Sequence, residues 1–158
     1  MNQRDMSEKK VELRTGYTTG SSATAAAKSA LLSIINQKKI ENVDIILPRG
    51  SSIQIPVNSC EFENEKAKCT VIKNGGDDPD VTHGAEIIVE LSLTENIDEI
   101  EIDGGEGVGI VTKPGLGLEI GKPAINPVPK KMINENLRAT GKEILEKKGI
   151  RIVISVPK

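Results

Sequence analysis

The chain has 158 residues, enough for one globular domain that buries a core. Its 21 basic and 23 acidic residues leave a net charge of −2, which argues against a nucleic-acid partner, because such partners call for a basic surplus. With one Tyr, one Phe and no Trp, the chain also lacks the aromatic platforms on which single-stranded nucleic acids stack.

The first residues are polar and charged, and no apolar run in the sequence is long enough to cross a bilayer. We therefore expect a cytoplasmic protein with no membrane partner. Residues 1–12 are predicted to be a flexible leader, and residues 13–158 a single domain. Cys60 and Cys69 lack the spacing of a zinc or redox motif, so we expect two reduced, partly buried thiols and no metal site.

A helix is predicted over residues 23–35, which are rich in alanine and other good helix formers. Residues 15–22, a run of hydroxyl and glycine residues, precede it and supply candidates for the N-cap. The small alanine face of this helix indicates close packing against another element.

Several strands are predicted next, because apolar residues alternate and turn residues separate the runs. Pro48 to Ser51 has the composition of a hairpin turn between the first two. The expected strands cover residues 43–47, 53–57, 67–73, 85–93, 97–103 and 150–154.

Residues 104–129 are rich in Gly and Pro yet carry apolar side chains, which is typical of a functional loop. A helix is predicted over residues 130–148, with Gly149 as its C-cap and Gly141 as a kink or a break between two shorter helices. This order favours the α+β class, with a mostly antiparallel sheet, a helix near the N-terminus and one or two helices near the C-terminus.

Residues 15–22 form the first candidate site. Free N–H groups at a helix N-terminus attract anions. The hydroxyls of Thr18, Thr19, Ser21 and Ser22 would add donors to a carboxylate or a phosphate. Helix capping alone explains one or two of these residues, but not so many in a row.

Residues 73–84 form the second candidate site, with three aspartates and the single histidine of the chain, His83. Imidazole can act as a base near neutral pH. Closely placed carboxylates, Asp78 among them, repel one another, which raises the pKa of at least one of them and prepares it for proton transfer. The spacing alone favours the alternative of a turn in which Asp side chains cap backbone N–H groups.

Two further candidates follow. Residues 104–117 superficially match a dinucleotide fingerprint, but Pro114 stands where a helix should open, so we favour close backbone approach to a ligand or to another strand. Lys113 would then offer a charge to an acidic group. Asn126, before the last predicted helix, is a candidate polar contact or cap.

Taken in series, these segments resemble the CbiD family, the cobalt-precorrin-5B C1-methyltransferases of anaerobic cobalamin biosynthesis. The order and spacing of the motifs extend the resemblance over nearly the whole chain from Leu13 onward. The matching stretches are residues 13–21, 76–84, 107–109 with 111–116, and 124–129. Ser22 is a departure, because the family usually has Cys at that position.

The resemblance implies methyl transfer from S-adenosylmethionine to C1 of a corrinoid substrate, a reaction that depends mostly on positioning two ligands. It implies that His83 and Asp78 handle a proton or shape the pocket. The residues expected to bind the acidic side chains of the corrinoid are Arg14, Thr18, Thr19, Ser21, Lys113 and Asn126.

Family members carry a second domain after the last strand, so the resemblance covers the N-terminal domain only, and we expect the isolated chain to be inactive. Whether it forms a homo-oligomer stays open. The alternative is a non-catalytic binding or assembly domain for an anionic small molecule. A third hypothesis is a phosphate-handling enzyme that uses residues 18–22 as a phosphate cradle, although the Walker pattern is absent.

Overall fold

The computed structural model describes residues 19–48, 50–72, 86–105 and 127–156, and gives only the backbone of residues 19 and 127–129. The elements are α1 (Thr19–Asn36), β1 (Asn42–Ile46), β2 (Ser52–Pro56), β3 (Ser59–Glu63), β4 (Lys66–Ile72), β5 (Glu86–Thr94), β6 (Ile100–Gly104), α2 (Pro127–Thr140), α3 (Lys142–Leu145) and β7 (Gly149–Ser155). The predicted α+β class is confirmed.

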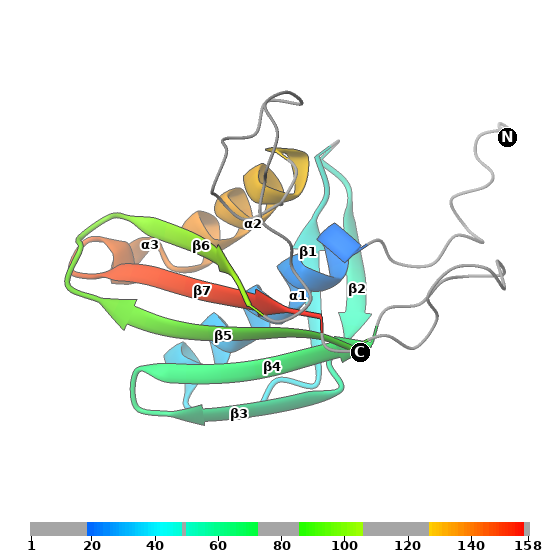
Figure 1. Cartoon of the computed structure of the whole chain (residues 1–158), viewed down its shortest axis with the longest axis horizontal. Coiled ribbons are helices and arrows are strands. Elements are labelled where there is room, and N and C mark those ends of the chain that lie inside the picture. Colours follow the sequence, from blue (N-terminus) through cyan, green and yellow to red (C-terminus); the bar gives the residue numbers. More distant parts are fainter. Residues whose placement is uncertain (1–18, 49, 73–85, 106–126, 157–158) are drawn as a thin grey trace, which may run out of the picture.

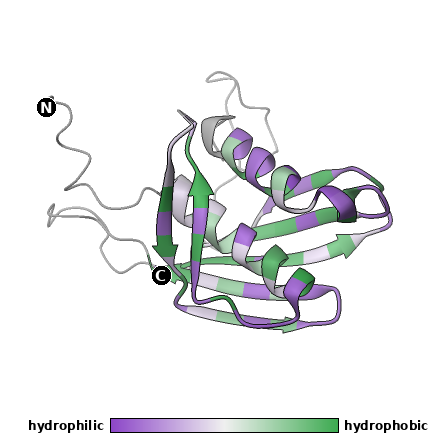
Figure 2. Ribbon diagram, turned by 180° about the vertical axis from the view of Figure 1, so that it is seen from behind, coloured by the Kyte–Doolittle hydropathy of each residue, from purple (hydrophilic) through white to green (hydrophobic). Residues whose placement is uncertain are grey.

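Five of the strands form one sheet in the order β3-β4-β5-β7-β6, and β1 pairs with β2 in a separate ribbon. Every strand pair is antiparallel except β6 with β7, which is parallel. The helices lie on one face of the five-stranded sheet, and none of the described helices covers the other face, here called the uncovered face (Figures 1 and 2).

Helix α1 is the centre of the core. It contacts α2, β1, β3, β4 and β5. Its alanines and Leu31 are buried, and so are hydroxyl residues such as Ser29 and Ser33. The predicted close packing is confirmed, and it extends over most of the helix surface, which is why small side chains fill most of its length. The stripe of Lys28, Leu32 and Ile35 is less buried.

The predicted strands are recovered with small shifts in their bounds. The hairpin turn is confirmed, since Leu47 N–H donates to Ser51 O at 2.7 Å and Gly50 has a φ of 95°. Strand β6 begins later than predicted because Asp98, at φ 66°, still belongs to the preceding turn. Strand β3 was not predicted, because this edge strand directs only Cys60 and Phe62 inward between exposed acidic residues.

The predicted C-terminal helix is two helices. The break at Gly141 is confirmed, and a Cβ there would lie 2.9 Å from Leu31 Cδ2 of α1. The prediction that Gly149 caps the helix is wrong, because α3 ends with Glu146 as its C-cap. Gly149 instead begins β7, where a Cβ would lie 2.1 Å from the carbonyl oxygen of Asn96.

Asn136 joins α2 to the ribbon. Its buried side-chain amide accepts from Ile46 N–H at 2.9 Å and donates to Ile46 O at 3.0 Å and to Met132 O at 2.8 Å. One side chain thus satisfies both backbone groups of the last residue of β1. Across the part of the chain that is described, no helix is long and apolar enough to cross a membrane.

Candidate functional site

One end of the five-stranded sheet adjoins the segments that carry the predicted site residues. Strand β4 ends at Ile72 and β5 begins at Glu86, and these two residues are register partners. Strand β6 ends at Gly104, opposite Ile154 near the end of β7. Residues 73–85 join β4 to β5, and residues 106–126 follow β6, so the chain leaves the described structure for both segments at this end, here called the site end.

Both long helices begin towards the site end (Figure 1). Gln37, just past the end of α1, lines a hollow with Asn64 and Glu65 in the turn between β3 and β4. Arg138, in the last turn of α2, donates to Asp98 in the turn between β5 and β6. These contacts place the helix C-termini at the opposite end, here called the turn end, so the chain enters α1 and α2 from the site end.

The first turn of α1 combines backbone N–H groups with buried hydroxyls. The first N–H groups of an α-helix have no carbonyl of their own helix to bind, and with the helix dipole they favour an anion. Thr24 Oγ1 donates to Gly20 O at 2.7 Å, whereas Ser22 Oγ is buried without a partner among the described residues. A buried hydroxyl without a partner costs about 1–3 kcal/mol, and a ligand atom that accepted from Ser22 would offset that cost.

Of the predicted site residues, the structure describes Ser21, which is buried in the first turn of α1, and the backbone of Thr19. The others lie outside the described residues: Arg14, Thr18, Asp78, His83, Lys113 and Asn126. Their convergence into one pocket therefore stays a prediction. It is supported by the observation that the segments carrying them all join described residues at the site end.

Close backbone approach in the glycine-rich stretch is confirmed at Gly105. Its N–H donates to Ile154 O at 2.7 Å, and a Cβ on Gly105 would lie 2.4 Å from Ser155 Oγ. Glycine thus allows the chain to leave β6 close beside the end of β7, although the Ser155 hydroxyl could rotate away from a larger residue. Ser155 was not predicted to be near the site, and its polar side chain at the end of an apolar strand was the available signal.

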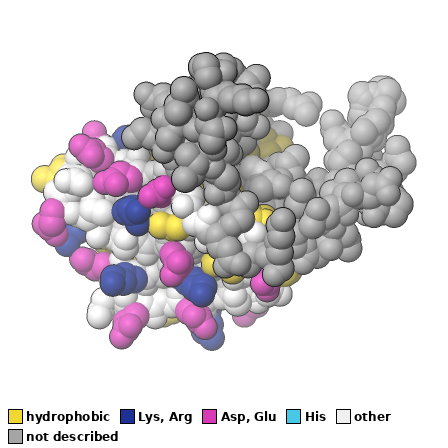
Figure 3. Space-filling model, in the orientation of Figure 1, with side chains coloured by type: hydrophobic (Ala, Val, Ile, Leu, Met, Phe, Trp, Pro, Cys, Tyr) yellow, Lys and Arg dark blue, Asp and Glu magenta, His cyan; other side chains and the backbone are white. Residues whose placement is uncertain are grey.

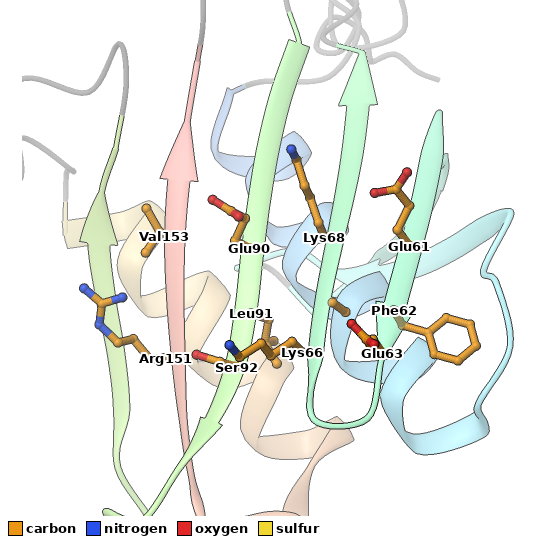
Figure 4. Close-up of a pocket in the computed structure, with 11 residues that line it drawn as sticks. Glu61, Phe62, Glu63, Lys66, Lys68, Glu90, Leu91, Ser92, Arg151 and Val153 are labelled. Carbon is orange, nitrogen blue, oxygen red and sulfur yellow. The ribbon is translucent and has the colours of Figure 1, made fainter.

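The uncovered face of the sheet carries charges of both signs (Figure 3) and a hollow of about 480 Å³ formed by β3, β4, β5 and β7 (Figure 4). In register, Lys68 lies between Glu61 of β3 and Glu90 of β5. Opposite charges on neighbouring strands are typical of a solvated sheet face. We assign no ligand to this hollow.

Lys28, which is partly buried on α1, has a structural partner. Burial lowers the pKa of Lys28, and the Asp44 carboxylate opposes that shift. The Lys28 ammonium group donates to the backbone carbonyl of Asp44, so it ties α1 to β1.

Cys60 and Cys69 are free and buried, as predicted. The described residues contain no cluster of three or more metal-ligating side chains.

Comparison with known proteins identifies the class. The model of the CbiD family matches residues 6–158. The cobalt-precorrin-5B C(1)-methyltransferase of Geobacillus sp. strain WCH70 is 48% identical over 154 residues, which cover 95% of this chain. The protein of the same name from Priestia megaterium is 48% identical over 146 residues, or 92% of this chain.

A solved structure agrees with this assignment. The crystal structure of the cobalamin biosynthesis protein CbiD from Archaeoglobus fulgidus superposes with a TM-score of 0.62 at 33% identity and covers 88% of this chain. The chain belongs to the CbiD family. It spans about two fifths of the length of these relatives, 41% and 40% of the two methyltransferases and 43% of the crystallised chain.

Proposed function

We propose that this chain is the N-terminal part of an S-adenosylmethionine-dependent methyltransferase that acts on C1 of cobalt-precorrin-5B in cobalamin biosynthesis. The observation that carries the proposal is the 48% identity, over nearly all of this chain, to proteins with that activity in their name. The role of this part is to hold the acidic corrinoid at the site end.

The chemistry of the site end fits a substrate with several carboxylates. The first turn of α1 offers N–H groups, and Ser22 offers a buried hydroxyl without a partner among the described residues. Hydrogen bonds to a carboxylate are charge-assisted and stronger than those between neutral groups. We propose that Thr18, Thr19 and Ser21 contribute further donors at this turn.

The remaining predicted site residues complete the proposed pocket. Arg14 and Lys113 would pair with carboxylates of the corrinoid, and Asn126 would add a polar contact. His83 and Asp78 would handle a proton or shape the pocket around C1. Transfer of a methyl group from a sulfonium to a ring carbon is an in-line displacement, so correct placement of the two reactants supplies most of the acceleration.

The cofactor site is proposed to need more than this chain. An adenosine group requires a mostly apolar cleft. The hollow of Figure 4 is lined instead by charged side chains such as Lys68, Glu90 and Arg151. Among the described residues it fits the methyl donor poorly. We therefore expect the chain alone to bind corrinoid without methylating it.

Calorimetric titration tests the proposal. The chain and a full-length relative that contains it would each be titrated with a cobalt corrinoid bearing free carboxylates, with S-adenosylmethionine, and with a nucleotide. We expect the corrinoid to bind both proteins, and S-adenosylmethionine to bind strongly only the full-length protein. Nucleotide binding in preference to corrinoid would contradict the proposal and favour a phosphate cradle at residues 18–22.

Helix α1 offers a matched control for the anion site. The hydroxyls of Ser22 and Ser29 are both buried without a partner among the described residues, but Ser22 lies in the first turn and Ser29 near the middle of the helix. Ser22→Ala should weaken corrinoid binding about tenfold, because it removes one charge-assisted hydrogen bond. Ser29→Ala should leave binding unchanged. Equal binding by both variants would remove Ser22 from the site.

A further inference from the structure

Two thiols face each other across the outermost strand pair of the sheet. Cys60 on β3 and Cys69 on β4 are direct register partners. Both belong to the hydrophobic core beneath α1, with exposed fractions of 5% and 0%. Neither is one of the predicted site residues, and both are free.

The hydrogen bonds of β4 define which kind of cross-strand pair the cysteines form. Leu93 N–H of β5 donates to Glu65 O at 3.1 Å, so residue 65 and every second residue after it direct their backbone groups to β5. Cys69 belongs to this set. Thr70 belongs to the other set, and its carbonyl accepts from Asn58 N–H, beside β3, at 2.8 Å.

Cys60 and Cys69 are therefore a non-hydrogen-bonded antiparallel pair. In such pairs the Cα atoms lie about 4.5 Å apart and the side chains are closest. Disulfides bridge Cα atoms that are about 4.4–6.8 Å apart. The register thus brings the two residues within disulfide range without a rearrangement of the backbone.

We propose that Cys60 and Cys69 form a reversible dithiol–disulfide pair that locks the edge strand β3 onto β4 beneath α1. The oxidant is a low-molecular-weight disulfide. The Cys60 thiolate attacks one sulfur of that disulfide, which yields a mixed disulfide and one small thiolate. The Cys69 thiolate then attacks the Cys60 sulfur and releases the second small thiol, so two protein thiols are oxidised and one disulfide is reduced.

The position of the two residues sets the order of attack. Strand β3 lies at the edge of the described sheet, where β4 is its one neighbour, and Cys60 on it retains some exposure, whereas Cys69 has none. Burial raises the pKa of the Cys69 thiol, and its hydrogen bond with Cys60 raises it further. Cys60 is thus the residue that meets the oxidant when the edge opens, and the rate of oxidation rises with pH.

Incubation of the folded chain with oxidised glutathione, followed by alkylation and intact-mass measurement, tests the pair. We expect loss of two hydrogens, no alkylation, and a cross-linked peptide that joins Cys60 to Cys69. Because the bridge closes a loop of about ten residues, the oxidised protein should unfold about 5 °C above the reduced protein. Dithiothreitol should reverse both changes.

The single variants provide the control. Cys60→Ser and Cys69→Ser each keep one thiol and should show no internal cross-link and no rise in Tm on oxidation. The measurement on the wild-type chain decides the proposal even where a variant fails to fold. Two alkylatable thiols after prolonged oxidation, or glutathione adducts that never resolve into the internal disulfide, would overturn it.

Discussion

The two ends of the sheet are built in different ways. At the turn end, short turns are tied by ion pairs: Lys148 Nζ lies 3.1 Å from Glu65 and 3.4 Å from Glu95, and Arg138 lies 2.9 Å from Asp98. At the site end, the described residues contribute helix N–H groups, buried hydroxyls and a glycine pressed against β7, and long segments connect the elements.

This difference suggests that the turn end mainly stabilises the fold and that the site end carries the proposed chemistry. The charged side chains of the turn end pair with one another, whereas the proposed site end has a buried hydroxyl, that of Ser22, without a partner among the described residues. Proteins commonly accept such local losses at functional sites and offset them elsewhere. Changes at the turn end should therefore alter the free energy of unfolding, and changes at the site end should alter turnover.

The largest effect is expected from His83→Ala in a full-length protein that contains this chain. If His83 handles a proton or shapes the pocket, the substitution should lower turnover about 100-fold, while the Tm stays unchanged. The measurement is the rate of corrinoid methylation by the purified variant. Unchanged turnover would discard the role, and loss of folding would show that His83 stabilises the structure instead.

A large effect on stability is expected at the turn end from Gly149→Ala. The new Cβ would lie 2.1 Å from Asn96 O and 2.5 Å from Thr94 Oγ1, and the backbone of Asn96 cannot rotate away as a flexible side chain can. We expect a loss of about 3 kcal/mol in the free energy of unfolding, measured by urea titration. Turnover per folded molecule should not change.

Gly50→Ala is the matched control for this substitution. Gly50 has a φ of 95° and open space around its Cβ position, so alanine there adds backbone strain without a clash. The expected loss is about 1 kcal/mol. If both variants lose the same amount, the contact with Asn96 is not what makes glycine necessary at position 149.

The sequence is informative where a pattern is local. The alternation of apolar residues predicts most strands, the composition of residues 48–51 predicts the hairpin turn, and Gly141 marks a helix break. Strand β3 is not predicted from the sequence, because an edge strand needs few apolar residues. The sequence does not predict that Gly149 leaves room for the backbone of Asn96, because only the tertiary fold brings the two residues together.

The candidate site depends even more on tertiary structure. Residue types and motif order suggest which segments carry chemistry, but only strand register shows that β4, β5, β6 and β7 present their ends together. Likewise, the run of hydroxyls predicts a capped helix, whereas the burial of the Ser22 hydroxyl away from any partner in the described part of the chain depends on what surrounds α1. The convergence of His83, Lys113 and Thr18 stays a prediction.

The smallest effect is expected from Asp98→Asn, which removes one charge at the turn end. Asparagine tolerates the left-handed φ of 66°, and Arg138 keeps its hydrogen bond to the Asp98 backbone carbonyl at 3.0 Å, so the substitution isolates the ion pair. The side chains of Arg138 and Asp98 are 44% and 72% exposed. Solvent screening therefore limits the expected loss to about 0.5 kcal/mol in the free energy of unfolding.

Salt distinguishes this electrostatic loss from a loss of packing. At 1 M salt the screening length is about 3 Å, so the wild type and Asp98→Asn should become equally stable in urea titrations. Asp98→Ala should lose about 1 kcal/mol more at any salt concentration, because alanine resists a positive φ. A loss in Asp98→Asn that persists in high salt, or a fall in turnover, would show that the turn end does more than stabilise the fold.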